Sequence, residues 1–267
     1  MESYICVHGH FYQPPRENAW LETIEMQDSA YPYHDWNERV NAECYAPNAA
    51  SRVLDSEGFI SLIVNNYAKI SFNFGPTLLA WMENNSPDTY RAILDADLKS
   101  IELRSGHGAA IAQPYNHIIM PLANRRDKYT QVLWGIRDFE YRFKRKSEGM
   151  WLPETAIDIE TLEIMADMGI KYTILAPNQA SRVKQIGSDH WDDVNNGSID
   201  PRKAYITRLP SGNSMVLFFY DGAISRSIAF EDVLSNGDNL SKRLVGAFSR
   251  ENDQPQIVNV ATDGETY

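Results

Sequence analysis

The layout of this 267-residue chain is set by seven short apolar runs, which alternate with longer stretches of helical periodicity. The runs cover residues 4–10, 69–75, 108–113, 149–154, 171–177, 214–221 and 256–263. Most of them are continuously apolar, which is typical of strands buried on both faces of a parallel sheet. The alternation therefore predicts an α/β fold with a parallel sheet, and seven such strands can close into a barrel related to the eight-stranded one.

The stretches between these runs carry apolar residues at the spacing of helices. Helices are predicted over residues 49–67, 77–101, 125–145 and 158–170. In the last of these, Asp158 has the residue type of an N-cap and Gly169 that of a helix stop. No Gly/Ser linker, repeat or low-complexity segment interrupts the pattern, so the sequence predicts one domain over residues 1–267.

Two long segments lack a clear period. Residues 11–48 are rich in Pro, Tyr, Trp and Asn, and residues 178–213 contain Gly, Pro, Asn and Asp throughout. Both follow predicted strands, and long ordered loops in that position are usually functional. We expect both inserts to lie over the edge of the sheet where the parallel strands end.

Composition narrows the classes of partner. The chain carries 36 Asp and Glu against 25 Lys and Arg, whereas nucleic-acid binding depends mainly on basic contacts to phosphate. No run approaches the roughly 18 apolar residues that span a bilayer, and the N-terminus lacks a basic region followed by an apolar one. Cys6 and Cys44 show no CxxC spacing, so both are expected to be reduced. We expect a cytoplasmic protein that binds neither nucleic acid nor membrane; its oligomeric state is not predicted.

Polar side chains gather at the carboxyl ends of the predicted strands, where parallel barrels build their active sites. The candidates are His8, His10, Trp151, Glu154, Asp221, Asp263 and Glu265, with His107 before the third strand and Gln113, Tyr115 and His117 after it. Glu154 is the most informative, because a carboxylate directly after an apolar strand is costly to bury without a purpose. Asp221, which precedes Gly222, is also consistent with a turn residue.

Two kinds of chemistry fit these residues. His8 and His10 share one face of the first strand, as in metal-dependent hydrolases of the amidohydrolase or deacetylase type, and such a site needs further ligands from other strand ends. A glycosidase instead requires two carboxylates across a cleft, and Glu154 and Asp263 fit that requirement at the ends of the fourth and seventh strands. The residues alone leave both interpretations open.

Three motifs, taken in order, resemble those of glycoside hydrolase family 57, whose members act on α-glucans. They are HGHFYQP at residues 8–14, GMWLPE at residues 149–154 and TDGETY at residues 262–267. Residues 107–122 are similar to the region around the family's second motif, with Ala109 and Ala110 in the neighbourhood where the family carries a glutamate.

The resemblance implies an α/β fold that is an incomplete, TIM-barrel-like parallel (β/α)7 barrel. It implies that Glu154 is the nucleophile and Asp263 the general acid/base of a retaining double displacement on α-linked glucan or oligosaccharide. The reaction is then hydrolysis, glucan transfer or branching, and needs neither cofactor nor metal. The side chains expected to contact substrate are His8, His10, Gln13, Trp151, His107, Asp221 and Glu265.

In the family, the chain continues beyond the Asp-Gly-Glu motif into a helical region. This sequence is therefore expected to be a single catalytic barrel domain that is truncated just after the acid/base and lacks that region. Because the second-motif glutamate is missing, a carbohydrate-binding barrel without catalysis stays open as a third class.

Overall fold

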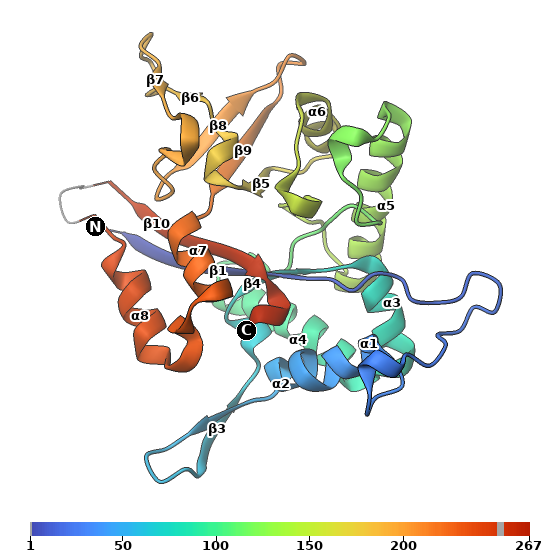
Figure 1. Ribbon diagram of the computed structural model, residues 1–267. Helices are drawn as coiled ribbons and strands as arrows, with labels where there is room; N and C mark the ends of the chain where they lie inside the picture. Colours follow the sequence, from blue (N-terminus) through green and yellow to red (C-terminus); the bar gives the residue numbers. More distant parts are fainter. Residues whose placement is uncertain (1, 250–253) are drawn as a thin grey trace.

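The computed structural model describes residues 2–249 and 254–267, which form a mixed α/β structure with two parallel groups of strands (Figure 1). In the first group, β1 (Ser3–Phe11) lies between β10 (Gln256–Asp263) and β4 (Ser71–Phe74) and is parallel to both. In the second group, β5 (Tyr172–Leu175) is parallel to β9 (Ser214–Phe219). The antiparallel strand β8 (Ala204–Arg208) pairs with the other side of β9.

Isolated parallel bridges connect the two groups. They pair Phe72 with Ala110, Ala112 with Met150, and Gly149 with Tyr172. On the far side, the Asp221 N–H donates to the Asn259 carbonyl oxygen at 2.8 Å, so the end of β9 meets the middle of β10. Backbone contacts thus pass through all seven predicted apolar runs. The predicted parallel pairing is confirmed for the paired strands and bridges, while Asp221 and Asn259 are joined by a single hydrogen bond.

Six longer helices pack beside these strands. They are α3 (Pro76–Asn85), α4 (Pro87–Leu103), α5 (Arg125–Phe143), α6 (Ile159–Asp167), α7 (Gly222–Phe230) and α8 (Gly237–Gly246). The predicted helix 77–101 is divided at Ser86, because Pro87 begins a new helix. The predicted ends of α6 are confirmed: the Asp158 side chain accepts from Thr161 N–H, and Gly169 follows the helix with φ +87°.

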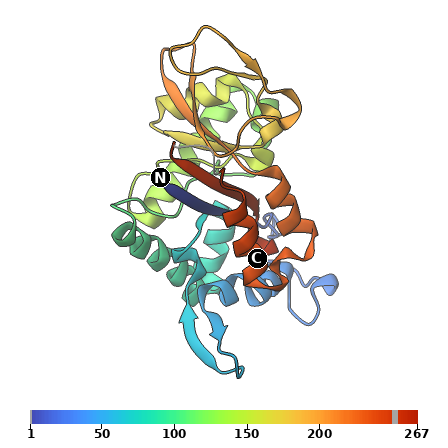
Figure 2. The same cartoon turned by 90° about the vertical axis from the view of Figure 1, so that its left-hand side faces the viewer.

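The predicted helix over residues 49–67 is wrong. The segment forms a hairpin of β2 (Ser51–Leu54) and β3 (Ile60–Val64), which projects from the rest of the chain in both views (Figures 1 and 2). Its turn explains the difference, because the Asp55 side chain accepts from the N–H groups of Glu57 and Phe59, while Gly58 takes φ +85°. Turn chemistry therefore prevails over the helical spacing of the apolar residues.

The strands separate two apolar environments. Phe11, Phe72 and Phe74 belong to the large core that contains side chains of α3, α4 and α5. A separate cluster combines residues from four of the parallel segments, namely Ile111, Trp151, Ile174 and Ala261. Because successive residues of a strand face opposite sides, His8 and His10 lie on the side opposite to Phe11.

The two inserts differ in position. Residues 11–48 contain α1 (Trp36–Val40), a π-helical turn (Asn41–Tyr45) and α2 (Ala46–Ala49), and they lie beyond the carboxyl end of β1 as expected (Figure 1). Residues 178–213 contain β6 (Arg182–Val183), β7 (Asp192–Asp193) and β8.

The second insert corrects part of the expectation that both cover the carboxyl edge. Gln179 lies there, because it donates to Thr155 O at 2.6 Å, but the later part of the insert does not. The carbonyl of Arg202 accepts from the N–H of Ile257, and that of Pro201 accepts from the Asn259 amide, so this part follows the first half of β10. Antiparallel pairing of β8 with β9 holds it there. Within the described part of the chain, no helix is long and apolar enough to cross a membrane.

Candidate active site

The site is built at the carboxyl end of β1, between its two neighbours. His10 pairs with Asp263 of β10 on one side and with Asn73 of β4 on the other. Partners at the same level of parallel strands face the same side, so the three side chains converge. Strand register therefore brings together residues that lie far apart in the sequence.

A chain of hydrogen bonds crosses this edge. His8 Nδ1 lies 2.9 Å from Ser71 Oγ, and His8 Nε2 lies 3.0 Å from Asn73 Oδ1. Asn73 Nδ2 donates to His10 Nδ1 at 2.9 Å, and His10 Nε2 lies 2.9 Å from His117 Nε2. A neutral imidazole has one N–H, so the order of donors runs from Ser71 through His8, Asn73 and His10 to His117.

Burial keeps the two histidines of β1 neutral. Desolvation lowers the pKa of His8 to about 4, against the hydrogen bond that His8 donates to Asn73 Oδ1, and it lowers the pKa of His10 to about 3. For His10, the neighbouring imidazoles of His117 and His8 lower the pKa further. Near neutral pH these side chains therefore act through hydrogen bonds and ring contacts rather than through charge.

Trp151 forms one wall of the site. Its ring stacks on His8 and His10, with centroids 5.1 and 5.2 Å apart. Although Trp151 is only 6% exposed, its indole N–H has no hydrogen-bond partner among the described residues. The amide nitrogen of Gln113, which is 2% exposed, also lacks one, while its Oε1 accepts from Asn73 at 2.5 Å. Two buried donors are thus available to a ligand with acceptor oxygens.

Glu154 is presented by a strained turn. It lies in the 3-10 turn Pro153–Thr155 with φ +56°, and Thr155 has φ +51°, although neither is glycine. Pro153 and Thr155 are buried while Glu154 is exposed, so the turn directs this carboxylate outward. Its conformation is held by Thr155 N–H donating to Leu152 O at 2.9 Å and by Gln179 donating to Thr155 O at 2.6 Å. Such strain is concentrated at functional sites.

Asp263 ends β10 at the same edge. Desolvation raises its pKa, the charge of Glu154 raises it further, and His117 opposes both. His117 in turn has a pKa lowered by burial, against the attraction of Glu154 and Asp263. Both carboxylates therefore act electrostatically on the histidine that ends the hydrogen-bond chain, and Glu154 acts on Asp263.

The turn after Asp263 is tied to the first insert. Glu265 accepts a hydrogen bond from the Tyr45 hydroxyl and another from the Tyr12 N–H at 3.2 Å. Burial raises its pKa, and these hydrogen bonds oppose the rise. Between the two acidic residues, a Cβ at Gly264 would lie 2.2 Å from the Phe11 ring, so only glycine fits. This geometry holds Asp263 in position relative to β1.

Of the sequence-predicted residues, His8, His10, Trp151, Glu154, Asp263 and Glu265 come together at this edge. Gln13 is half-buried in the first insert and accepts from Arg16 at 2.6 Å. Asp221 is not brought there, because its side chain caps α7 by accepting from Ile224 N–H at 2.9 Å.

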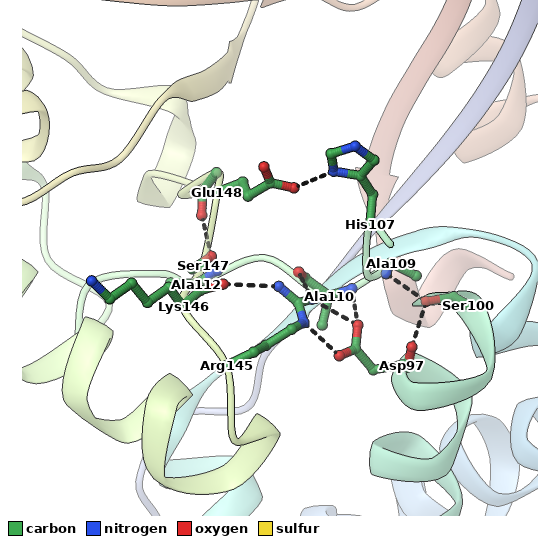
Figure 3. Close-up of polar contacts among 11 residues, drawn as sticks. Asp97, Ser100, His107, Ala109, Ala110, Ala112, Arg145, Lys146, Ser147 and Glu148 are labelled. Atoms are coloured by element: carbon green, nitrogen blue, oxygen red, sulfur yellow. Dashed lines mark hydrogen bonds and ion pairs between the residues drawn. The ribbon is translucent and has the colours of Figure 1, made fainter. Parts of the chain in front are cut away.

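His107 lies at the opposite end of the strands. Its Nδ1 is 2.7 Å from Glu148 Oε2, next to the Asp97–Arg145 ion pair (Figure 3). Arg145 also donates to the Ala110 carbonyl at 2.7 Å, and Asp97 accepts from the Ala110 N–H at 2.8 Å. The side chains of Arg145 and Asp97 thus hold the backbone of the buried segment that carries Ala109 and Ala110.

Sequence reasoning missed Asn73, and it gave no role to Gln113, Tyr12 or His117. A usable signal was present for Asn73, since a fully buried amide in the middle of an apolar strand requires partners. His117 was a candidate from its position after the third predicted strand, but its contact with His10 follows from the path of the loop and was not predictable.

The hydrogen bonds of His8 and His10 are relevant to the metal-hydrolase interpretation, which requires free ring nitrogens as ligands. All four ring nitrogens of His8 and His10 have protein partners. Over residues 2–249 and 254–267, no three His, Cys, Asp or Glu side chains are grouped so as to hold a metal ion. The donors of this edge are thus arranged as a hydrogen-bonded wall with two carboxylates beside it.

Comparisons with known proteins agree with the motifs. The model of glycosyl hydrolase family 57 matches residues 38–267. Alpha-amylase 1 of Dictyoglomus thermophilum is 27% identical over 107 residues, which are 40% of this chain and 15% of that protein. The chain therefore spans only a small part of the length of this curated relative.

Solved structures share the fold at low identity. A 4-alpha-glucanotransferase from Thermococcus litoralis aligns at TM-score 0.62 with 17% identity over 99% of this chain and 34% of that one. An exo-type maltose-forming amylase from Pyrococcus sp. ST04 aligns at TM-score 0.66 with 17% identity over 100% of this chain and 43% of that one.

A probable polysaccharide deacetylase from Pseudomonas aeruginosa PAO1 also aligns, at TM-score 0.57 with 9% identity over 98% of this chain and 78% of that one. The fold is thus shared between glucan-active enzymes and deacetylases. The family model, which covers most of the sequence, decides between them: the chain belongs to glycosyl hydrolase family 57.

Proposed function

We propose that this chain carries the catalytic centre of a retaining enzyme that acts on α-linked glucan by double displacement. The observation that carries the proposal is the pairing of an exposed, strained Glu154 with Asp263, whose pKa its charge helps to raise. A general acid must be protonated at the working pH, and a neighbouring carboxylate favours that state. Family membership supports α-glucan as the substrate class.

In the first step, a Glu154 oxygen forms a bond to the anomeric carbon while the bond from that carbon to the leaving oxygen breaks. Asp263 gives its proton to the leaving oxygen. In the second step, Asp263 takes a proton from water or from a sugar hydroxyl, the oxygen of that group bonds to the anomeric carbon, and Glu154 is released. Two inversions retain the configuration, and such enzymes hold their carboxyl groups about 5–5.5 Å apart.

The neighbouring side chains fit roles in substrate binding. The unpartnered donors of Trp151 and Gln113 suit the acceptor oxygens of a sugar. The neutral His8 and His10 hold Trp151 through ring contacts, and both carboxylates act electrostatically on His117. Glu265 accepts hydrogen bonds from the Tyr45 hydroxyl and the Tyr12 N–H, and these bonds fix the turn that carries Asp263.

We infer that the parallel segments form an incomplete (β/α)7 barrel. Three features support this: the bridges that link the two strand groups, the contact of Asp221 N–H with Asn259 O on the far side, and the separate cluster around Trp151 to which four segments contribute. In parallel barrels the active site lies at the carboxyl ends of the strands, where Glu154 and Asp263 stand.

Covalent trapping tests the proposal directly. The chain is incubated with 5-fluoro-α-glucosyl fluoride, whose activated leaving group allows the first step and whose ring fluorine slows the second. We expect a single glucosyl adduct by intact mass, located on Glu154 by peptide mapping, and none on the Glu154→Gln variant. Asp263→Asn, which still has the nucleophile, is expected to be labelled. An unlabelled wild-type chain, or an adduct on another residue, would contradict the proposal.

A further inference from the structure

A second aromatic pocket lies on the surface, on the outer side of α5. Its volume is about 370 Å³. The residues that line it are Tyr115, Trp134, Arg137, Asp138 and Tyr141. Neither the catalytic carboxylates nor the histidine chain belongs to this group, so the pocket is separate from the proposed active site.

Helical periodicity places the pocket's main side chains in one row. Trp134 and Tyr141 are seven residues apart on α5, which is two turns, and Arg137 lies between them. Trp134 is 51% exposed and Tyr141 is 61% exposed. An exposed row of two large rings on one helix face is costly in water unless it has a use.

The rings are held in orientation. Tyr115 contacts Trp134 edge to face, with centroids 5.7 Å apart and planes at 85°. The Lys144 ammonium lies 4.6 Å from the centroid of Tyr141. Asp138 accepts from Arg142 Nε at 3.0 and 3.2 Å. The pocket therefore presents restrained aromatic and carboxylate groups, which reduces the entropy lost when a ligand binds.

Helix α5 and one loop connect the pocket to the active site. A Cβ at Gly135 would lie 1.9 Å from the Gln113 carbonyl oxygen, so α5 packs directly on the end of the third parallel segment. The loop that follows is fastened to α5, because the N–H groups of Tyr115 and Asn116 donate to Gln131 at 3.1 and 2.7 Å. This loop carries both Tyr115, which lines the pocket, and His117, which contacts His10 in the active site.

We infer that this pocket is an auxiliary binding subsite for an α-glucan chain. The faces of Trp and Tyr rings provide rigid, amphipathic area against which the C–H faces of glucosyl units can pack. Arg137 donates to Glu140 at 3.0 Å and Asp138 accepts from Arg142, so both charges of the pocket are balanced by partners on α5. A pocket whose charges are balanced suits an uncharged, hydroxyl-rich ligand better than a charged one, and the further N–H groups of Arg137 can donate to its hydroxyls. The choice of α-glucan as the ligand rests on the proposed function, whereas the existence of the pocket is independent of it.

Affinity electrophoresis in gels containing glycogen tests this inference. Migration of the wild-type chain is expected to be slowed, and Trp134→Ala and Tyr141→Ala are each expected to weaken the apparent affinity at least about fivefold, as loss of a stacking contact worth about 1 kcal/mol or more implies. Trp134→Phe keeps an aromatic face and is expected to retain part of the affinity. Tyr129→Ala is the matched control, because Tyr129 is 53% exposed on the same helix but does not line the pocket.

The outcomes separate this inference from the proposed function. Retardation that depends on Trp134 but survives in Glu154→Gln supports the auxiliary subsite, whatever the trapping experiment gives. Equal retardation of Trp134→Ala and Tyr129→Ala, with both variants folded by circular dichroism, overturns it, and so does a wild-type chain that is not slowed. A dimer in analytical ultracentrifugation that dissociates on Trp134→Ala would assign the pocket to a second copy of the chain and overturn it as well.

Discussion

His10 and Asp263 lie directly opposite each other on the neighbouring parallel strands β1 and β10. Partners in a parallel ladder face the same side, so the proposed acid/base stands beside an imidazole that burial keeps neutral. Desolvation and the charge of Glu154 then raise the pKa of Asp263, without an imidazolium on His10 to counteract them. The pKa of Asp263 is therefore governed mainly by its burial and by the charge of Glu154.

The first prediction concerns this coupling. Glu154→Gln removes one negative charge while it keeps the size of the side chain, so the pKa of Asp263 is expected to fall. NMR titration of the Asp263 carboxyl carbon in both proteins measures the shift. Glu43→Gln, in the first insert and with an ion-pair partner of its own, serves as a charge-matched control. An unchanged pKa in Glu154→Gln would show that the carboxylates do not interact.

Backbone strain at the proposed nucleophile can be measured as stability. Glu154→Gly places glycine at φ +56°, which glycine adopts without steric cost, so the free energy of unfolding is expected to rise by about 1 kcal/mol relative to Glu154→Gln. Both variants lack the carboxylate, so the comparison isolates the backbone. Urea denaturation at pH 7 gives the difference. If Glu154→Gly is the less stable of the two, the turn is not strained.

The buried histidines predict sensitivity to acid. Their folded-state pKa values of about 4 and about 3 lie below the ordinary 6.5, so the stability they contribute is present above pH 6.5 and is lost as the pH falls toward the folded values. Between pH 7 and pH 5 each is expected to lower the free energy of unfolding by roughly 2 kcal/mol. Urea denaturation across this range is the measurement.

A matched pair of variants isolates the histidine contribution. His8→Gln is expected to be less stable at pH 7 but to lose roughly 2 kcal/mol less between pH 7 and pH 5 than the wild type. His107→Gln, at the exposed opposite end of the strands, is the control. A His8→Gln chain with the full acid sensitivity of the wild type would assign that sensitivity to other groups.

Asp263 is expected to change the stability of the fold with pH in the opposite direction from the buried histidines. Its folded pKa is raised, so its favourable contribution is present at low pH and is lost as the pH rises through that value. Asp263→Asn is therefore expected to raise the melting temperature at pH 7 and to bring no gain at pH 3, while it removes the proposed acid/base. Asp95→Asn, on an exposed position of α4, is the comparison. A lower melting temperature at pH 7 would mean that the charged carboxylate is stabilised in the fold.

The strand framework was predictable because a strand buried on both faces needs an apolar residue at nearly every position, and the runs of this chain meet that requirement. Local patterns also made Glu154 and Asp263 candidates for the site, because each stands at the end of such a run. The β2–β3 hairpin was not predictable, because its apolar residues repeat at helical spacing although the turn around Asp55 and Gly58 determines the structure.

Contacts that depend on tertiary geometry were not predictable, even for residues that the sequence made candidates. The pairing of Asn73 with His10 follows from the register of β1 with β4, which no local pattern encodes. His107 precedes its strand, so strand direction takes it to the edge opposite the carboxylates. His117 reaches the site through a loop fastened to α5, and a sequence window does not contain that contact.

The donor order from Ser71 to His117 has a consequence for the charge balance of the whole cleft. Moving a proton onto the accepting nitrogen of His117 would set it against the N–H of His10, and relief would require every upstream member to reverse its donor. The whole chain of hydrogen bonds thus opposes protonation of this nitrogen, in agreement with the lowered pKa of His117. If Asp263 is the acid/base proposed above, it exchanges its proton with the substrate and the incoming hydroxyl alone, and the neutral histidines neither supply nor withdraw one.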